Sequence, residues 1–139
     1  MGDMETGGCL CGDLTYKFDR DAVISAHHCH CKDCQRSTGS GKATLILVPN
    51  DALETTGELK TYTVIGSEGA HVNRGFCPNC GCQTMSNLDE MPVMTIIKVG
   101  TLDDSSWVKI DSSFWADTAE DWSPVDPRVP SFEKNPPTV

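Results

Sequence analysis

The chain has 139 residues, with 20 acidic against 11 basic side chains and a formal net charge of -9. This length suits one domain with a modest core, and the acidity opposes binding to phosphate backbones and to anionic membranes. Nucleic acid and membrane are therefore not expected as partners. Residues 1–8 lack the basic and apolar regions of a secretory signal, and no apolar run could span a bilayer, so a cytoplasmic location is expected.

The first predicted elements are strands. Residues 12–18 alternate apolar with polar side chains, which is the period of a half-buried strand. Residues 43–49 form a continuous, β-branched apolar run that ends at a proline, as in a buried strand. Residues 53–66 then predict two short strands around Gly57.

One helix and one more strand complete the predicted body. The helix candidate is residues 32–39, which end in a glycine suited to a helix C-cap. Residues 92–104 are rich in β-branched side chains and predict a strand that ends near Gly100. The fold class is therefore expected to be mainly β, with antiparallel sheets and short helical turns.

The C-terminal residues 107–139 differ in composition from the rest, because they hold all three tryptophans and most of the prolines. Such a segment cannot form long regular elements, but its aromatic side chains favour packing. We expect one domain over residues 1–139, with a core at about 7–106 and this tail packed on it. If the tail packs across a second copy, the chain forms a homodimer.

Eight cysteines dominate the chemistry of the sequence. Without a secretory signal they favour metal ligation over disulfides, because the cytosol keeps thiols reduced. Tetrahedral zinc takes four Cys or His ligands, usually as close pairs from two segments. The cysteines fall into three groups: Cys9 and Cys11; Cys29, Cys31 and Cys34; and Cys77 and Cys80 with Cys82 just beyond.

The segment Cys77-Pro-Asn-Cys80-Gly81 has the form of a zinc knuckle, a tight turn in which glycine accepts a conformation that strains other residues. It needs a second pair of ligands. Cys9 and Cys11 are the best candidates, because use of the triplet would leave two other cysteines unassigned. The spacing therefore predicts a structural zinc on Cys9, Cys11, Cys77 and Cys80.

The triplet Cys29, Cys31 and Cys34 supplies three ligands and leaves a position for water or substrate, which is typical of catalytic zinc. In the alternative, a fourth side chain completes the shell and the site is inert. The candidates for that ligand are His27, His28, His30 and Cys82. Iron is a second alternative, although no ferredoxin spacing is present.

Three segments in this order, GGCLCGDLTY, CHCKDCQRSTGSG and FCPNCGCQTM, resemble the motif blocks of the glutathione-dependent formaldehyde-activating enzyme family, which also contains centromere protein V. The resemblance covers residues 7–86 and extends more loosely to the tail. It implies a β-tent fold of packed antiparallel sheets with two zinc ions, partitioned over the cysteines as the spacing predicts. It also implies a carbon–sulfur lyase that forms or cleaves S-(hydroxymethyl)glutathione.

Glutathione carries two carboxylates and an amine, so its site needs cationic and hydrogen-bonding groups near the triplet. Arg36 is the candidate for a carboxylate clamp. Hydroxyl and backbone N–H donors are expected from Ser37, Thr38, Gly39 and Ser40. The alternative is that Arg36 is a surface charge and that this run only ends a helix. At the level of the whole protein, the alternative to catalysis is a zinc-stabilised interaction module whose tail forms the partner surface.

Overall fold

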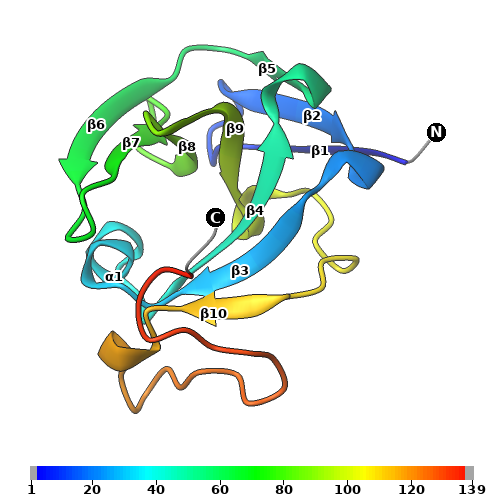
Figure 1. The fold of residues 1–139 in the computed structure, drawn as a ribbon. Coiled ribbons are helices and arrows are strands. Elements are labelled where there is room, and N and C mark those ends of the chain that lie inside the picture. Colours follow the sequence, from blue (N-terminus) through cyan, green and yellow to red (C-terminus); the bar gives the residue numbers. More distant parts are fainter. Residues whose placement is uncertain (1–2, 137–139) are drawn as a thin grey trace.

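Ten strands form two sheets in the computed structural model, which describes residues 3–136 (Figure 1). The smaller sheet has the order β1-β2-β5, and its strands are β1 (Met4–Gly8), β2 (Thr15–Asp19) and β5 (Leu53–Thr56). The larger sheet, in spatial order, comprises β10 (Ser112–Phe114), β3 (Ser25–Cys29), β4 (Ala43–Pro49), β9 (Met91–Lys98), β8 (Gln83–Leu88), β7 (His71–Phe76) and β6 (Lys60–Ile65). The prediction of a mainly β fold with packed antiparallel sheets is confirmed.

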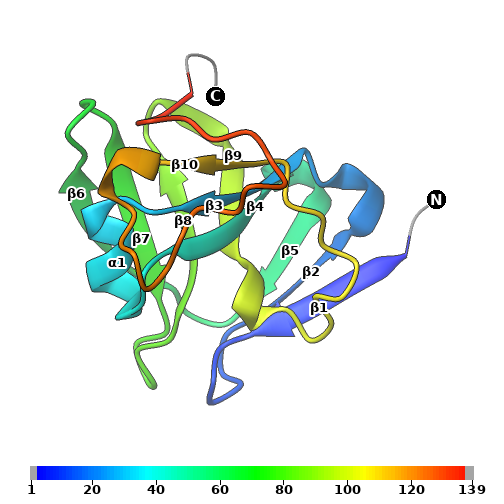
Figure 2. The same ribbon diagram turned by 90° about the horizontal axis from the view of Figure 1, so that it is seen from below.

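The two sheets share a core. Tyr16 and Phe18 of β2 are buried against Ile46 and Val48 of β4 and Ile97 of β9. The alternation seen in residues 12–18 therefore places one face of β2 against the larger sheet. Figures 1 and 2 show the smaller sheet at one side of the molecule and strands β6, β7 and β8 at the opposite side.

The helix α1 (Lys32–Thr38) connects β3 to β4 and agrees with its prediction. Gly39 ends it in the left-handed conformation, with φ of 68°, and donates its N–H to the carbonyl of Gln35. In both ribbon views α1 lies beside β7, on the side of the larger sheet away from β1 and β2 (Figures 1 and 2). Four short 3-10 turns occur in the described chain: Arg20–Ala22, Asn50–Ala52, Val99–Thr101 and Ala116–Thr118. None of the helices described there is long and apolar enough to cross a membrane.

The other predicted strands are also present. Residues 43–49 form β4, and residues 53–66 form β5 and β6 on either side of Gly57. The run 92–104 forms β9 only as far as Lys98, because the chain then turns through Val99–Thr101. Strands β1, β3, β7, β8 and β10 were not predicted from the sequence.

The chain after Trp107 contacts both sheets and α1. Trp107 packs edge-on against Phe18, and the guanidinium of Arg20 lies 5.3 Å from the centre of its ring. Strand β10 then pairs parallel with β3, an arrangement that the sequence did not predict. Further along, a side chain at Gly41 would clash with Ser123, so the loop after α1 lies directly against this segment.

Gly57→Ala should lower the free energy of unfolding by about 2–4 kcal/mol. Gly57 has φ of 106°, and a Cβ there would clash with the carbonyl oxygen of Asp13. Gly69→Ala is the matched control, because Gly69 has a similar φ of 90° but no atom within 4 Å of the added carbon. It should cost about 1 kcal/mol, from backbone strain alone. Chemical denaturation of both variants measures the difference, and equal losses would contradict a clash at Gly57.

Candidate metal centres

The first cysteine cluster joins the turn after β1 to the turn after β7. Its members are Cys9, Cys11, Cys77 and Cys80, and their sulfur atoms all lie within 4.8 Å of one another. The Sγ of Cys11 lies 3.6 Å from that of Cys9 and 3.7 Å from that of Cys77. The fold thus brings together four thiols from two distant segments of the chain, since Cys11 and Cys77 are 66 residues apart.

Two similar turns present these thiols. The N–H of Gly12 donates to the carbonyl of Cys9, and the N–H of Gly81 donates to the carbonyl of Cys77. Both glycines have positive φ, at 86° and 75°, a conformation that favours glycine. Each turn therefore directs a pair of thiols toward one point.

Electrostatics in this cluster favour negative charge on Cys9 and Cys80 but not on Cys77. Burial raises the pKa of Cys9, but hydrogen bonds from the Leu14 N–H and from the thiols of Cys11 and Cys77 outweigh it and bring the pKa to about 6. Cys82 does not belong to the group. It is half-buried against Cys9, Leu14 and Cys77, and its thiol is free.

The second cluster lies where β3 meets α1. Cys29 ends β3, Cys31 caps α1, and Cys34 lies in the first turn of the helix. Their sulfur atoms lie within 4.8 Å of one another, and the backbone N–H of Cys34 donates to the Sγ of Cys31 over 3.2 Å. Cys29 and Cys34 are buried, whereas Cys31 is half-buried.

Charge in the second cluster is concentrated on one thiol. Hydrogen bonds from Cys29 and Cys31 lower the pKa of Cys34 to about 3, and the positive charges of Arg74 and Lys98 act in the same direction. The same contacts raise the pKa of Cys29. Three thiols this close cannot all ionise unless a cation lies among them, so the donor set fits a metal ion.

The neighbouring histidines lie outside this group. His27 is stacked on Phe114, and its two ring nitrogens bond the hydroxyls of Ser112 and Ser25 at 2.8 and 2.7 Å. His28 uses Nδ1 to bond the Thr44 hydroxyl, and burial is the main cause that lowers its pKa to about 4. His30 is fully buried, and within residues 3–136 neither of its ring nitrogens has a hydrogen-bond partner.

Gln35 holds the segment between the ligands in place. Its Nε2 donates to the carbonyl of His30 at 2.9 Å and to the carbonyl of Thr118 at 3.0 Å. The hydroxyl of Thr118 donates to the same His30 carbonyl at 2.9 Å. Protein contacts therefore fix the loop that carries Cys29 and Cys31 from both α1 and the C-terminal segment.

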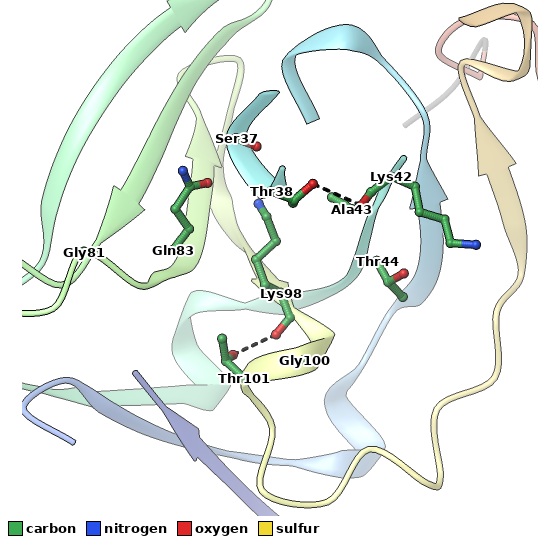
Figure 3. Close-up of a pocket in the computed structure, with 10 residues that line it drawn as sticks. All are labelled: Ser37, Thr38, Lys42, Ala43, Thr44, Gly81, Gln83, Lys98, Gly100 and Thr101. Carbon is green, nitrogen blue, oxygen red and sulfur yellow. Dashed lines mark hydrogen bonds between the residues drawn. The ribbon is translucent and has the colours of Figure 1, made fainter. Parts of the chain in front are cut away.

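A cleft with a volume of about 430 Å³ lies beside α1 (Figure 3). Ser37 and Thr38, two of the predicted substrate-binding residues, are part of its lining. The predicted residues Arg36, Gly39 and Ser40 are exposed and are not part of it. The other lining residues are Lys42, Ala43, Thr44, Gly81, Gln83, Lys98, Gly100 and Thr101.

Comparison with known proteins agrees with the motif blocks. The family model for glutathione-dependent formaldehyde-activating enzyme, GFA, matches residues 4–118. The chain belongs to this family. A GFA match over this range includes both cysteine clusters and α1. The resemblance inferred from the sequence is thereby confirmed.

Comparison with solved structures shows that the fold itself is shared with a known protein. A crystal structure of a Rhodobacter sphaeroides protein is similar with a TM-score of 0.57 and 20% identity, and the match covers 91% of this chain and 99% of that one. A sequence search of curated proteins gave no match. The function of this GFA member is therefore inferred from its cysteine clusters and from the cleft beside α1.

Two basic residues near the second cluster were missed by sequence reasoning. Lys98 lines the cleft, and Arg74 donates from Nη1 to the hydroxyl of Ser37 at 3.3 Å. Lys98 ends an apolar strand, and Arg74 belongs to a strand that was not predicted. No local motif marks either residue, because strand pairing brings both to the site.

Proposed function

We propose that the chain is a zinc-dependent carbon–sulfur lyase, which adds a thiol such as glutathione to formaldehyde or a related electrophile and cleaves the adduct in reverse. One observation carries the proposal. Cys29, Cys31 and Cys34 form a group of three that could hold a metal ion, and no fourth Cys, His, Asp or Glu of residues 3–136 joins them. The cleft is next to this group, because Ala43 packs with Cys29 and Cys34 and is part of the cleft lining. A three-ligand site leaves a position for substrate.

Zinc fits the geometry of the first cluster. Four sulfur atoms at about 2.3 Å from a tetrahedral zinc lie about 3.8 Å from one another. The sulfur separations of 3.6 and 3.7 Å in the first cluster are close to this value. We therefore assign a structural zinc to Cys9, Cys11, Cys77 and Cys80 and a catalytic zinc to the triplet, two ions per chain.

Cys29, Cys31 and Cys34 would hold the zinc ion, which when bound would favour the thiolate form of a substrate thiol, because coordination removes the thiol proton. Addition of the substrate thiolate to formaldehyde would form a sulfur–carbon bond, move the carbonyl π pair to oxygen, and require one proton at that oxygen. Ser37 and Thr38 line the cleft and are proposed substrate contacts; their hydroxyls donate to the carbonyl of Cys34 in this structure, so a substrate would meet them first as acceptors. Arg36, Gly39 and Ser40 remain proposed substrate contacts at the exposed end of α1.

The same proposal makes glutathione the small-molecule partner and the cytoplasm the location, where glutathione keeps thiols reduced. The acidic charge of -9 supports the exclusion of nucleic acid and membranes as partners. One domain that includes the tail, and a homodimer formed through that tail, also remain predictions.

The test is NMR exchange spectroscopy with 13C-formaldehyde and glutathione. Because the adduct also forms without protein, the quantity to measure is the exchange rate between free and glutathione-bound formaldehyde. Protein with two zinc ions per chain should raise this rate at substoichiometric concentration, and chelator-treated protein should not. A fully zinc-loaded protein that leaves the rate unchanged with glutathione and with small thiols would instead support the interaction module.

A further inference from the structure

Lys98 lies on the same face of the larger sheet as the second cysteine cluster. Cys29 of β3 is directly opposite Ala43 of β4, and Leu45 of β4 is directly opposite Lys98 of β9. Ala43 and Leu45 are two residues apart in one strand, so their side chains point to the same face. Cys29, Ala43 and Leu45 pack in one cluster with Cys34, which confirms that this face lies under α1.

Arg74 reaches the same face from β7. It is opposite Ser86 of β8, and Ser86 is opposite Ile96 of β9, two residues before Lys98. The bond from Arg74 to the Ser37 hydroxyl anchors its guanidinium next to the cleft lining. Two cations from neighbouring parts of the sheet therefore converge below α1.

These two cations have no acidic partner in the described chain. The ion pairs found among residues 3–136 involve neither Lys98 nor Arg74, and the Nε of Arg74 is buried without a hydrogen-bond partner. The cleft lining has two lysines and no acidic residue, in a chain whose net charge is -9. Both side chains are half-buried, and charge partly withdrawn from water without an acidic partner is costly, so the site favours an anion.

Figure 3 shows where the two cleft lysines point. The ammonium group of Lys98 extends across the cleft toward Thr38 of α1, with Gln83 on the other side (Figure 3). The side chain of Lys42 points away from that group (Figure 3). Gln83 contributes a buried Oε1 for which the residues described provide no donor. Lys98 is therefore the cation that a molecule in the cleft would meet.

We propose that Lys98, with Arg74 behind it, binds a carboxylate of the thiol substrate and makes the enzyme selective for anionic thiols. The inference rests on the proposed function and names the residue that sets substrate class. In this arrangement Lys98 would hold a carboxylate of the substrate in the cleft, on the same face of the sheet as the triplet.

The test compares glutathione with its diethyl ester, in which both carboxylates are blocked, by calorimetric titration of the zinc-loaded protein. A charge-assisted contact is worth about ten- to hundredfold in affinity, so the wild type should prefer glutathione by that factor. Lys98→Met should reduce the preference to about threefold or less, and Lys98→Arg should retain much of it. Lys42→Met removes an equal charge at the same cleft and should leave most of the preference intact.

Two results would overturn the inference. If Lys98→Met weakens the binding of glutathione and of its diethyl ester equally, Lys98 only balances the charge of the cysteine thiolates. If Arg36→Gln rather than Lys98→Met removes the preference, the carboxylate binds at the exposed end of α1.

Binding of S-methylglutathione, measured by NMR titration, separates this inference from the proposed function, because its blocked sulfur cannot react. Loss of that binding in Lys98→Met, in a protein that does not accelerate formaldehyde exchange, would keep the inference and reject the function. If the protein accelerates exchange but Lys98→Met binds S-methylglutathione as the wild type does, the proposed function is kept and the inference about Lys98 is rejected.

Discussion

Cys80→Ser should unfold the protein at room temperature. Cys80 belongs to the cluster that links the turn after β1 to the turn after β7, and Cys11 and Cys77 in that cluster are 66 residues apart. The zinc ion proposed there would close a long loop between the two sheets. Structural zinc contributes about 10–16 kcal/mol in zinc-finger peptides, which matches or exceeds the total stability of about 5–15 kcal/mol of a typical domain.

Cys82→Ser is the matched control, because Cys82 lies two residues away, is half-buried and stands outside the metal-binding group. It should cost only about 1 kcal/mol, since one small buried side chain becomes slightly more polar. Circular dichroism and metal analysis of both variants measure the contrast. Native spectra and two zinc ions in Cys80→Ser would exclude Cys80 as a structural ligand.

Features of the fold that depend on residues a few positions apart could be predicted from the sequence. Cysteines two or three positions apart, followed by Gly12 or Gly81, indicate a turn that directs two thiols to one side, and the structure brings both pairs together. The run 43–49 and the helix 32–39 were equally predictable, because burial on both faces and a C-cap glycine are encoded within a few residues. Candidate metal sites built from close pairs of cysteines can therefore be predicted before the fold is known.

What depends on strand pairing was not predictable. Strand β3 contains His27 and His28, polar residues that hide its periodicity. It becomes a strand because distant partners satisfy them: Ser112 and Phe114 on β10 contact His27, and Thr44 on β4 bonds His28. Lys98 and Arg74 were missed for the same reason. Their meeting near the triplet follows from the register of four strands, which no segment encodes alone.

Cys34→Ser should abolish catalysis while the fold remains. The second cluster spans only residues 29–34, so a metal ion there closes a short loop. Closing a short loop removes little conformational entropy from the unfolded chain and therefore stabilises the fold little. Protein contacts already fix this loop, through Gln35 and Thr118 on the carbonyl of His30. The variant should lose one of two zinc ions and keep a native circular dichroism spectrum.

The expected loss in formaldehyde exchange is at least about a hundredfold, because even residues that only support a metal ligand are worth about 10–100-fold. Metal analysis, thermal unfolding and NMR exchange on the same preparation separate the possible outcomes. If Cys34→Ser and Cys80→Ser unfold equally, the division between catalytic and structural sites is wrong. If Cys34→Ser loses one zinc but retains the exchange rate, the chemistry lies elsewhere. Because the two clusters differ in the length of chain they close, this pair of variants tests the division directly.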